Sequence, residues 1–334
     1  MRAWVLTEPK PVAEKPLKVV DKAIPEPAAG QVRLRVLVCG ICRTDLHIVA
    51  GEIPLPKLPI TPGHQVVAIV DQLGPGVNKL KVGDRVGAPW LAWTDGTCYY
   101  CRNERENLCD QGKFNGQHYD GGYADYMIAH ADFVYPIPEG YDEIHAAPLL
   151  CSGVIGYRSL KLSQVPLRGK LGLYGFGSSA HVTIQVAEYL GAECYVITRG
   201  EKGQQFAREQ GAVWAGGPED TPPELLDAVI VFAPVGDLIP TALKHVRKGG
   251  IVTSAGIHMT DIPQFPYEIL WGERIIRSVA NSTREDVSEL LELAAKAKIK
   301  PETEELDFEH LNDHLLAFDK GKIKGTGVVR VGKG

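Results

Sequence analysis

Apolar residues follow two different patterns along the chain, and the clearer one occupies its second half. Between residues 170 and 279, short apolar runs alternate with stretches in which apolar positions have helical spacing. Such alternation is typical of strand–helix–strand units that build a parallel sheet. The apolar runs lie at 171–174, 194–197, 228–232, 251–255 and 275–279. They predict an α/β domain with a doubly wound parallel sheet.

The first 150 residues have the second pattern, which indicates short strands and turns. Residues 32–38 alternate apolar and polar side chains, as a strand with one buried face does, and the Pro and Gly residues that follow disfavour helices. Near the other end, 284–297 has the spacing of an amphipathic helix, and 327–331 is a strand that we expect to join the first domain. We predict a β-rich domain at 1–152, completed by 288–334, and the α/β domain at 153–287.

Composition narrows the class of protein. The chain has 334 residues, enough for two domains, and its 44% hydrophobic and 23% charged residues are typical of a folded globular protein. Its net charge of −5 gives no basic surface for nucleic acid or anionic lipid. We find neither a signal-peptide pattern at the start nor an apolar run of about 18 residues that could span a bilayer. We therefore expect a cytoplasmic protein with neither nucleic-acid nor membrane partners.

Four potential metal ligands lie close together in one polar stretch. Asp95, Cys98, Cys101 and Cys109 have the spacing D-x2-C-x2-C-x7-C. Zinc accepts thiolate and carboxylate in a tetrahedral site, so Asp95 can complete the set that the three cysteines begin. A loop of free or disulfide-linked cysteines is the alternative, but C-x2-C pairs in intracellular proteins usually bind metal. The stretch predicts a structural zinc site.

A glycine-rich turn follows the first strand of the α/β domain. The strand at 171–174 leads into G-x-G-x-x-A, and a helical pattern comes next. In dinucleotide-binding domains the first Gly permits the tight turn, the second lets the backbone approach a pyrophosphate, and the small third residue allows close packing. Amide groups at the helix start then face the phosphates. The predicted cofactor-binding residues of this turn are Gly175, Gly177, Ser178, Ser179 and Ala180.

The end of the next strand bears on the type of dinucleotide. NAD-binding domains usually have an acidic residue there, which binds the ribose 2′-hydroxyl. This chain has Thr198 and Arg199, with Lys202 close behind. A guanidinium suits a 2′-phosphate, so we favour NADP over NAD. NAD stays open, because Arg199 can also be a solvated surface charge.

Cys42, His64 and Cys151 are three further candidate ligands, and each is weak evidence by itself. Their contexts carry a resemblance. The Gly63-His64 turn, the stretch V-G-D-R-V at 82–86, the metal-binding stretch at 95–109 and the glycine-rich turn together resemble the zinc-dependent medium-chain alcohol dehydrogenases. The resemblance covers nearly the whole chain, and in detail the chain is similar to bacterial propanol-preferring enzymes. It implies a GroES-like catalytic domain, a Rossmann cofactor domain and a homotetramer or homodimer.

The resemblance also implies roles for particular residues near the first strand. Cys42, His64 and Cys151 are expected to hold a catalytic zinc, and Asp45 is expected to orient His64. Cys39 alternates with buried strand positions, so we expect it in the core and not as a ligand.

The remaining expected roles concern the proton and the cofactor. By similarity, Thr44 accepts the alcohol proton and His47 passes it to solvent through the cofactor ribose. Arg43 is expected to contact the pyrophosphate. A hydrogen-bonding role in a loop is the alternative for Thr44, Asp45 and His47.

The chain departs from the family at several positions. Gln65 stands where relatives commonly have Glu after the zinc-binding His, Asp95 replaces a cysteine, and Thr326 stands where many relatives have a pyrophosphate-binding Arg. We also expect a narrow alcohol slot, which favours small substrates, although core packing is the alternative for its residues. The residues expected to narrow it are Trp90, Leu91 and Trp93.

The sequence thus predicts an alcohol dehydrogenase with two zinc ions and NADP or NAD, which converts small aliphatic or aromatic primary alcohols into aldehydes. A related dehydrogenase of polyols, secondary alcohols or formaldehyde is the near alternative. A non-catalytic protein that senses the cofactor is the alternative from another class.

Overall fold

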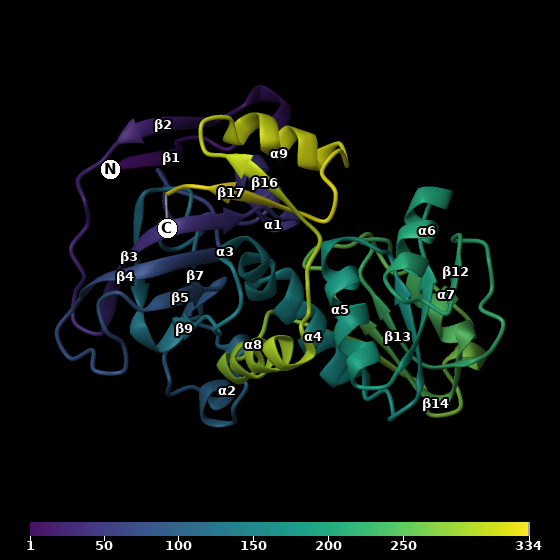
Figure 1. The fold of residues 1–334 in the computed structure, drawn as a ribbon. Helices are drawn as coiled ribbons and strands as arrows, with labels where there is room; N and C mark the ends of the chain where they lie inside the picture. The colour runs from purple at the N-terminus through teal and green to yellow at the C-terminus, as the bar shows by residue number, and fades with distance from the viewer. Residues whose placement is uncertain (333–334) are drawn as a thin grey trace. The chain divides into compact units, whose positions relative to one another are not determined.

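The computed structural model describes residues 1–332, which form two compact units (Figure 1). Unit 1 contains Met1–Cys151, Asn281–Ala295 and the chain from Pro301 onward. Unit 2 contains Ser152–Ala280 and Lys296–Lys300. Among residues 1–332, no helix has both the length and the apolar character needed to cross a membrane.

A seven-stranded sheet forms the centre of unit 1, and most of its strand pairs are antiparallel. Its strand order is β16-β17-β3-β4-β5-β9, with β8 paired to β3. The strands are β3 (Gln31–Gly40), β4 (Val66–Leu73), β5 (Arg85–Ala88), β8 (Tyr126–His130), β9 (Tyr135–Pro136), β16 (Thr303–Asp307) and β17 (Thr326–Arg330). Because β17 pairs with β3, the last strand returns to the first unit, as the sequence predicts.

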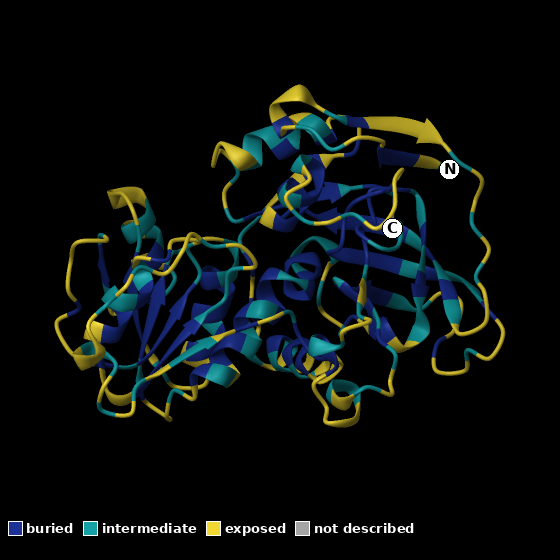
Figure 2. Ribbon diagram, turned by 180° about the vertical axis from the view of Figure 1, so that it is seen from behind, coloured by how far each residue is buried: buried dark blue, intermediate teal, exposed yellow. Residues whose placement is uncertain are grey.

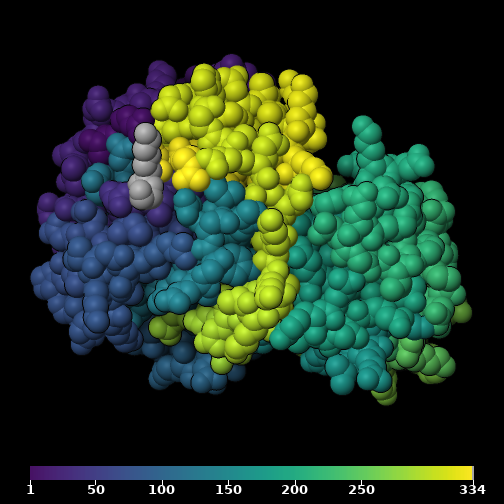
Figure 3. Space-filling view, viewed as in Figure 1, coloured from purple at the N-terminus to yellow at the C-terminus, as the bar shows by residue number. Residues whose placement is uncertain are grey.

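The ends of the chain pack together in unit 1. Figure 3 shows the yellow C-terminal segment beside the purple N-terminal segment. The Trp4 indole donates a hydrogen bond to the Phe308 carbonyl (2.8 Å), and the Asn312 amide donates one to the Leu17 carbonyl (2.9 Å). The other elements that lie in or begin in unit 1 are β1 (Arg2–Leu6), β2 (Leu17–Asp21), β6 (Leu91–Trp93), β7 (Lys113–Phe114), α1 (Arg43–Ala50), α2 (Tyr99–Arg102), α3 (Glu143–Ala146), α8 (Arg284–Ala297) and α9 (Leu311–Asp319).

Unit 2 is built on a six-stranded sheet in which every pair of neighbouring strands is parallel. The order is β12-β11-β10-β13-β14-β15, from β10 (Lys170–Tyr174), β11 (Glu193–Ile197), β12 (Trp214–Gly216), β13 (Leu226–Val231), β14 (Val246–Ser254) and β15 (Ile275–Ser278). Counted within the unit this is the order 3-2-1-4-5-6 of dinucleotide-binding domains. The predicted doubly wound parallel sheet is therefore confirmed.

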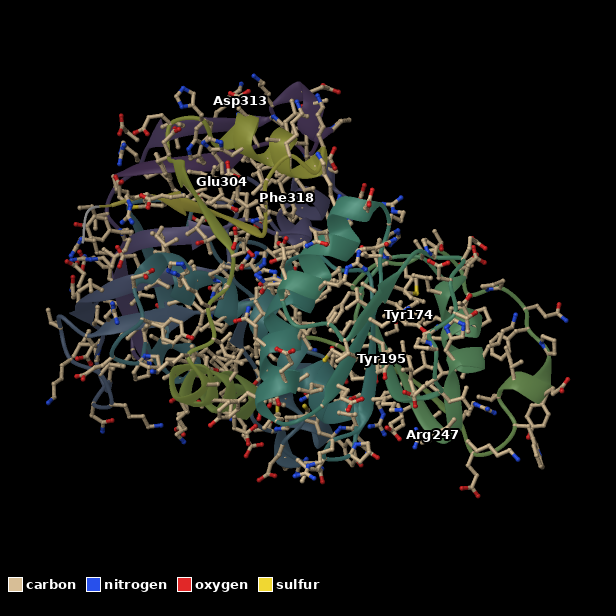
Figure 4. All side chains as sticks on the ribbon, turned by 45° about the vertical axis from the view of Figure 1, so that its right-hand side comes forward. Tyr174, Tyr195, Arg247, Glu304, Asp313 and Phe318 are labelled. Carbon is tan, nitrogen blue, oxygen red and sulfur yellow. The ribbon has the colours of Figure 1, made fainter. Side chains whose placement is uncertain are left out.

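The central strands of unit 2, β10, β11 and β13, are largely buried because helices pack on the sheet (Figure 2). The helices are α4 (Ser152–Ser163), α5 (Ser178–Tyr189), α6 (Glu201–Glu209) and α7 (Leu238–His245). Tyr174 and Tyr195, labelled in Figure 4, come from the adjacent strands β10 and β11, and both are buried. Since the strand order reverses between β10 and β13, ligands of such sheets bind beyond the carboxyl end of β10.

Candidate metal centres and cofactor loop

Helix α1 begins at a capping box that also arranges metal ligands. Cys42 is its N-cap, and the Thr44 amide donates a hydrogen bond to Cys42 Sγ at 3.3 Å. In return the Cys42 amide donates to Asp45 Oδ2 at 2.9 Å. Such reciprocal bonds satisfy donors that a helix start otherwise leaves unpaired. The turn-rich pattern of this region did not predict a helix, and the box explains why eight residues suffice to form one.

Three predicted ligands converge beside this helix start. Cys42 Sγ lies 3.1 Å from His64 Nε2 and 3.9 Å from Cys151 Sγ, and all three atoms lie within 4.8 Å of one another. Zinc–thiolate bonds of about 2.3 Å at tetrahedral angles put two sulfurs about 3.8 Å apart. The cluster therefore has the donor atoms and the spacing of a three-ligand zinc site.

A buried carboxylate lies behind the imidazole of His64. Asp45 Oδ1 lies 3.2 Å from His64 Nδ1, and both side chains are fully buried. Burial raises the pKa of Asp45 above its usual value. A metal-binding His commonly donates a hydrogen bond from its second ring N–H to a carboxylate, which fixes the tautomer and the ring orientation. Asp45 has this position relative to His64.

The charges in the cluster favour the metal-binding form of Cys42. Burial opposes ionisation, but contacts with Cys151 and His64 outweigh it and hold the pKa of the Cys42 thiol well below its usual value. Burial also disfavours a charged imidazole, yet Cys42 and Asp45 raise the pKa of His64 well above its usual value. By contrast, burial keeps the pKa of Cys39 well above its usual value, so Cys39 stays a neutral core thiol.

The other predicted residues of α1 have different surroundings. Thr44 is buried next to Cys42. His47 lies in the last turn with its Nδ1 hydrogen-bonded to Glu52, a residue that the sequence patterns did not single out. Arg43 is exposed, and its guanidinium contacts Asp319 at 3.3 Å.

The second cluster is the one predicted from local spacing. Asp95 Oδ1 accepts hydrogen bonds from the amides of Thr97 (2.7 Å) and Cys98 (2.8 Å), and Asp95 Oδ2 lies 3.2 Å from Cys109 Sγ. These hydrogen bonds from backbone amides hold the pKa of the Asp95 carboxyl well below its usual value. Ligand atoms of Asp95, Cys98, Cys101 and Cys109 all lie within 4.8 Å of one another, which fits a closed four-ligand zinc site.

A carboxylate of the same stretch anchors a distant helix. Glu106 is only 6% exposed, and its Oε1 accepts a hydrogen bond from the Arg284 amide at 2.8 Å. Arg284 is the first residue of α8, so Glu106 supplements the cap that Thr283 and Asp286 form there. No local pattern signals a contact between residues 178 positions apart in the chain.

The predicted cofactor turn follows β10. Gly175 has φ 89°, and a Cβ there would lie 2.8 Å from the Ala233 amide, so only glycine fits. Gly177 is the N-cap of α5, and a Cβ there would meet no atom within 4 Å. Ser178 and Ser179 open the helix, and Ala180 is buried. The turn therefore has the backbone and the open space that a pyrophosphate needs.

The residues expected to distinguish the cofactors lie after β11. The Thr198 amide donates a hydrogen bond to the Gly216 carbonyl at 2.9 Å. Arg199 and Lys202 are exposed on either side of Gly200, which caps α6.

The three residues expected to narrow the alcohol slot have different surroundings. The Trp90 ring lies 6.2 Å from the His64 ring and stacks on Phe114 at 4.3 Å. Leu91 is buried in the core, and Trp93 contacts the Lys113 ammonium at 5.1 Å. Thus Trp90 flanks the cluster, whereas core packing accounts for Leu91.

Gln65, the departure next to His64, has a buried side chain. Neither of its side-chain polar atoms has a hydrogen-bond partner within residues 1–332. Gly40 makes room for it, because a Cβ at Gly40 would lie 3.0 Å from the Gln65 amide carbon.

Comparisons with known proteins agree with the predicted resemblance to alcohol dehydrogenases. Residues 28–139 match the family model of the alcohol dehydrogenase GroES-like domain. A probable alcohol dehydrogenase of Mycobacterium tuberculosis (strain CDC 1551 / Oshkosh) is 43% identical, over 99% of this chain and 97% of the relative. An alcohol dehydrogenase of Geobacillus stearothermophilus is 36% identical, over 95% of this chain and 97% of the relative. The structure of an acetophenone reductase from Geotrichum candidum, in complex with NAD, superposes with a TM-score of 0.88 at 26% identity. The superposition covers 99% of this chain and 97% of the reductase chain.

The Asp95 cluster makes a prediction about metal content. Asp95→Ala should lower bound zinc from two ions per chain to one, since three thiols cannot close the four-ligand site. Because loss of a metal is among the larger destabilising changes, we expect Tm to fall by about 5 °C or more. Elemental analysis and calorimetry measure both effects. Asp110→Ala, at an exposed carboxylate of the same stretch, is the matched control, and unchanged zinc in Asp95→Ala would remove Asp95 from the ligand set.

Proposed function

This chain belongs to the zinc-dependent medium-chain alcohol dehydrogenase family and is an NAD(P)-dependent alcohol dehydrogenase, and we propose that it converts small primary alcohols into aldehydes reversibly. The convergence of Cys42, His64 and Cys151 is the observation that supports this proposal most. A zinc ion held by these residues supplies a Lewis acid for the alcohol oxygen. We also propose that unit 1 is the catalytic domain and unit 2 the cofactor domain.

The residues around the cluster have distinct proposed tasks. Asp45 holds the His64 ring through Nδ1, so that Nε2 faces the metal. Thr44, buried beside Cys42, takes the proton of the alcohol, and His47 at the other end of the helix passes it on. Gln65 is neutral where a carboxylate is common in the family, so no second carboxylate competes for the metal here.

The substrate class rests on the wall beside His64. The stacked rings of Trp90 and Phe114 form a flat apolar surface next to the cluster, which suits an unbranched or aromatic side chain. A panel of primary, secondary and polyhydric alcohols, with formaldehyde, separates this proposal from the related dehydrogenases. A protein that only senses the cofactor would turn over none of them.

We propose NADP as the preferred cofactor. The turn at Gly175 and Gly177 is expected to take the pyrophosphate, and Arg199, Thr198 and Lys202 the 2′-phosphate. Arg199 is exposed and lies where NAD-specific domains have a carboxylate. Arg43 is proposed to contact the pyrophosphate, as the family resemblance implies.

We propose a homo-oligomer, a dimer or a tetramer, in the cytoplasm. Strand β15 is an edge of the unit 2 sheet, and it and the preceding loop carry exposed apolar side chains: Ile275 is 42% and Trp271 61% exposed. Exposed edges of this kind favour pairing with a second copy. Seven free cysteines suit a reducing compartment.

Substitution of a zinc ligand tests the catalytic centre. Cys42→Ser should lower kcat at least about 1,000-fold, a loss of about 4 kcal/mol in transition-state stabilisation, because the metal loses a thiolate. Cofactor binding to unit 2, measured by fluorescence titration, should stay within twofold. Cys39→Ala removes a neighbouring thiol that is no ligand and should keep activity. If Cys42→Ser turns over alcohol like the wild type, the assignment of the catalytic zinc is wrong.

Substitution of Arg199 tests the cofactor proposal. Arg199→Ala should raise KM for NADP about tenfold, which corresponds to about 1.4 kcal/mol, since the 2′-phosphate loses a charged partner. KM for NAD is the internal control and should change little. A wild-type enzyme with a marked preference for NAD contradicts the proposal.

A charge on β15 tests the oligomer. Ile275→Asp should convert a dimer into monomers, or a tetramer into smaller assemblies, in size-exclusion chromatography with light scattering, because a carboxylate at the pairing edge repels its own copy. Val213→Asp places the same charge at an exposed apolar position beside β12, the opposite edge of that sheet, and should leave the assembly intact. A monomeric wild type refutes the proposal.

A further inference from the structure

Helix α1 ends in a turn that brings a carboxylate onto His47. Gly51 has φ 76°, and its amide donates to the Ile48 carbonyl at 3.2 Å. A Cβ at Gly51 would lie 2.8 Å from the Pro9 ring, so this turn requires glycine. The next amide, that of Glu52, donates to the His47 carbonyl at 2.9 Å. The backbone of the turn therefore fixes Glu52 beside His47.

The side chains of this pair form a hydrogen bond between His47 Nδ1 and Glu52 Oε2. The His47 side chain is 13% exposed, whereas that of Glu52 is 56% exposed. The imidazole is thus largely enclosed, and the carboxylate is the member of the pair that faces solvent. A carboxylate accepts only, so the bond requires the proton on Nδ1.

We propose that Glu52 is a positioning residue for the proton relay: by accepting a hydrogen bond from Nδ1–H it holds His47 in the tautomer whose Nε2 carries no proton and can accept one. The proposal rests on the proposed role of His47. Oxidation of an alcohol releases a hydride, which goes to the nicotinamide, and one proton. That proton binds His47 Nε2, and the resulting imidazolium is stabilised by the Glu52 carboxylate until water removes a proton. Reduction of an aldehyde uses the same groups in reverse.

Carboxylates on the elements packed against α1 have cationic partners of their own. These elements are α9 and the short helix Val12–Glu14. On α9, Asp319 pairs with Arg43, and Asp313, labelled in Figure 4, pairs with Lys15. Glu14 lies near Lys10, and His314 lies 3.4 Å from Asp307. Glu52, in contrast, is held beside His47 by the turn and forms its hydrogen bond with the His47 imidazole.

Nuclear magnetic resonance tests the tautomer without substrate, zinc chemistry or turnover. In protein labelled with ¹⁵N-histidine, the His47 signals are assigned by their loss in His47→Gln. We expect wild-type His47 to carry its proton on Nδ1 and Glu52→Gln to give a mixture of tautomers. Glu14→Gln, on the helix that packs against α1, is the matched control and should leave the signals unchanged.

Kinetics test the consequence for the relay. Glu52→Gln should lower kcat for alcohol oxidation about tenfold with KM within twofold, and added imidazole should restore the rate of this variant but not raise that of the wild type. A role limited to closing the helix end would change Tm and leave kcat and the imidazole response alone. An unchanged tautomer or an unchanged kcat in Glu52→Gln overturns the proposal.

The two proposals fail in different ways. If His47→Gln keeps full kcat, the proposed relay through His47 fails. If His47→Gln is slow while Glu52→Gln behaves like the wild type, only the role of Glu52 fails. If the wild type turns over no alcohol, the proposed function fails, and the resonance experiment still decides whether Glu52 sets the tautomer.

Discussion

The capping box at the start of α1 is the constraint on which the Cys42, His64 and Cys151 cluster of unit 1 depends. One pair of hydrogen bonds, between Cys42 and Thr44 and between Cys42 and Asp45, both starts the helix and fixes a thiol and a carboxylate on it. The thiol meets His64 and Cys151, and the carboxylate meets the far side of the His64 ring. Helix formation and ligand placement are therefore the same event, which gives a binding site on a rigid element.

A carboxylate held by backbone N–H donors also forms part of the second candidate metal centre. Asp95 accepts two backbone N–H hydrogen bonds at one carboxylate oxygen, and Asp45 accepts one; in each residue the other oxygen lies beside a candidate ligand. Amides that hold one oxygen limit the rotation of the carboxylate, so it lies in place before any ion binds. The proposed replacement of a cysteine ligand by Asp95 is therefore supported by the backbone N–H donors of the turn around it. Glu106 extends the same stretch to α8 and links the metal site to a helix from the other end of the chain.

Features set by local spacing could be predicted from the sequence, and features set by the approach of distant segments could not. The alternating runs predicted the parallel sheet, and D-x2-C-x2-C-x7-C predicted the second cluster. Cys42, His64 and Cys151 are far apart in the chain, so only the family resemblance grouped them. The helix at 43–50 was missed because its stability comes from a capping box with a cysteine, which is an uncommon N-cap.

The central claim is that one chain holds two zinc ions in two different ligand sets. Diffraction from crystals of the purified protein, recorded on both sides of the zinc absorption edge, tests it directly. The account predicts two anomalous peaks per chain: one among Cys42 Sγ, His64 Nε2 and Cys151 Sγ, and one enclosed by Asp95 and the three cysteines at 98, 101 and 109. Zinc-replete crystals with no peak at the first position would contradict it.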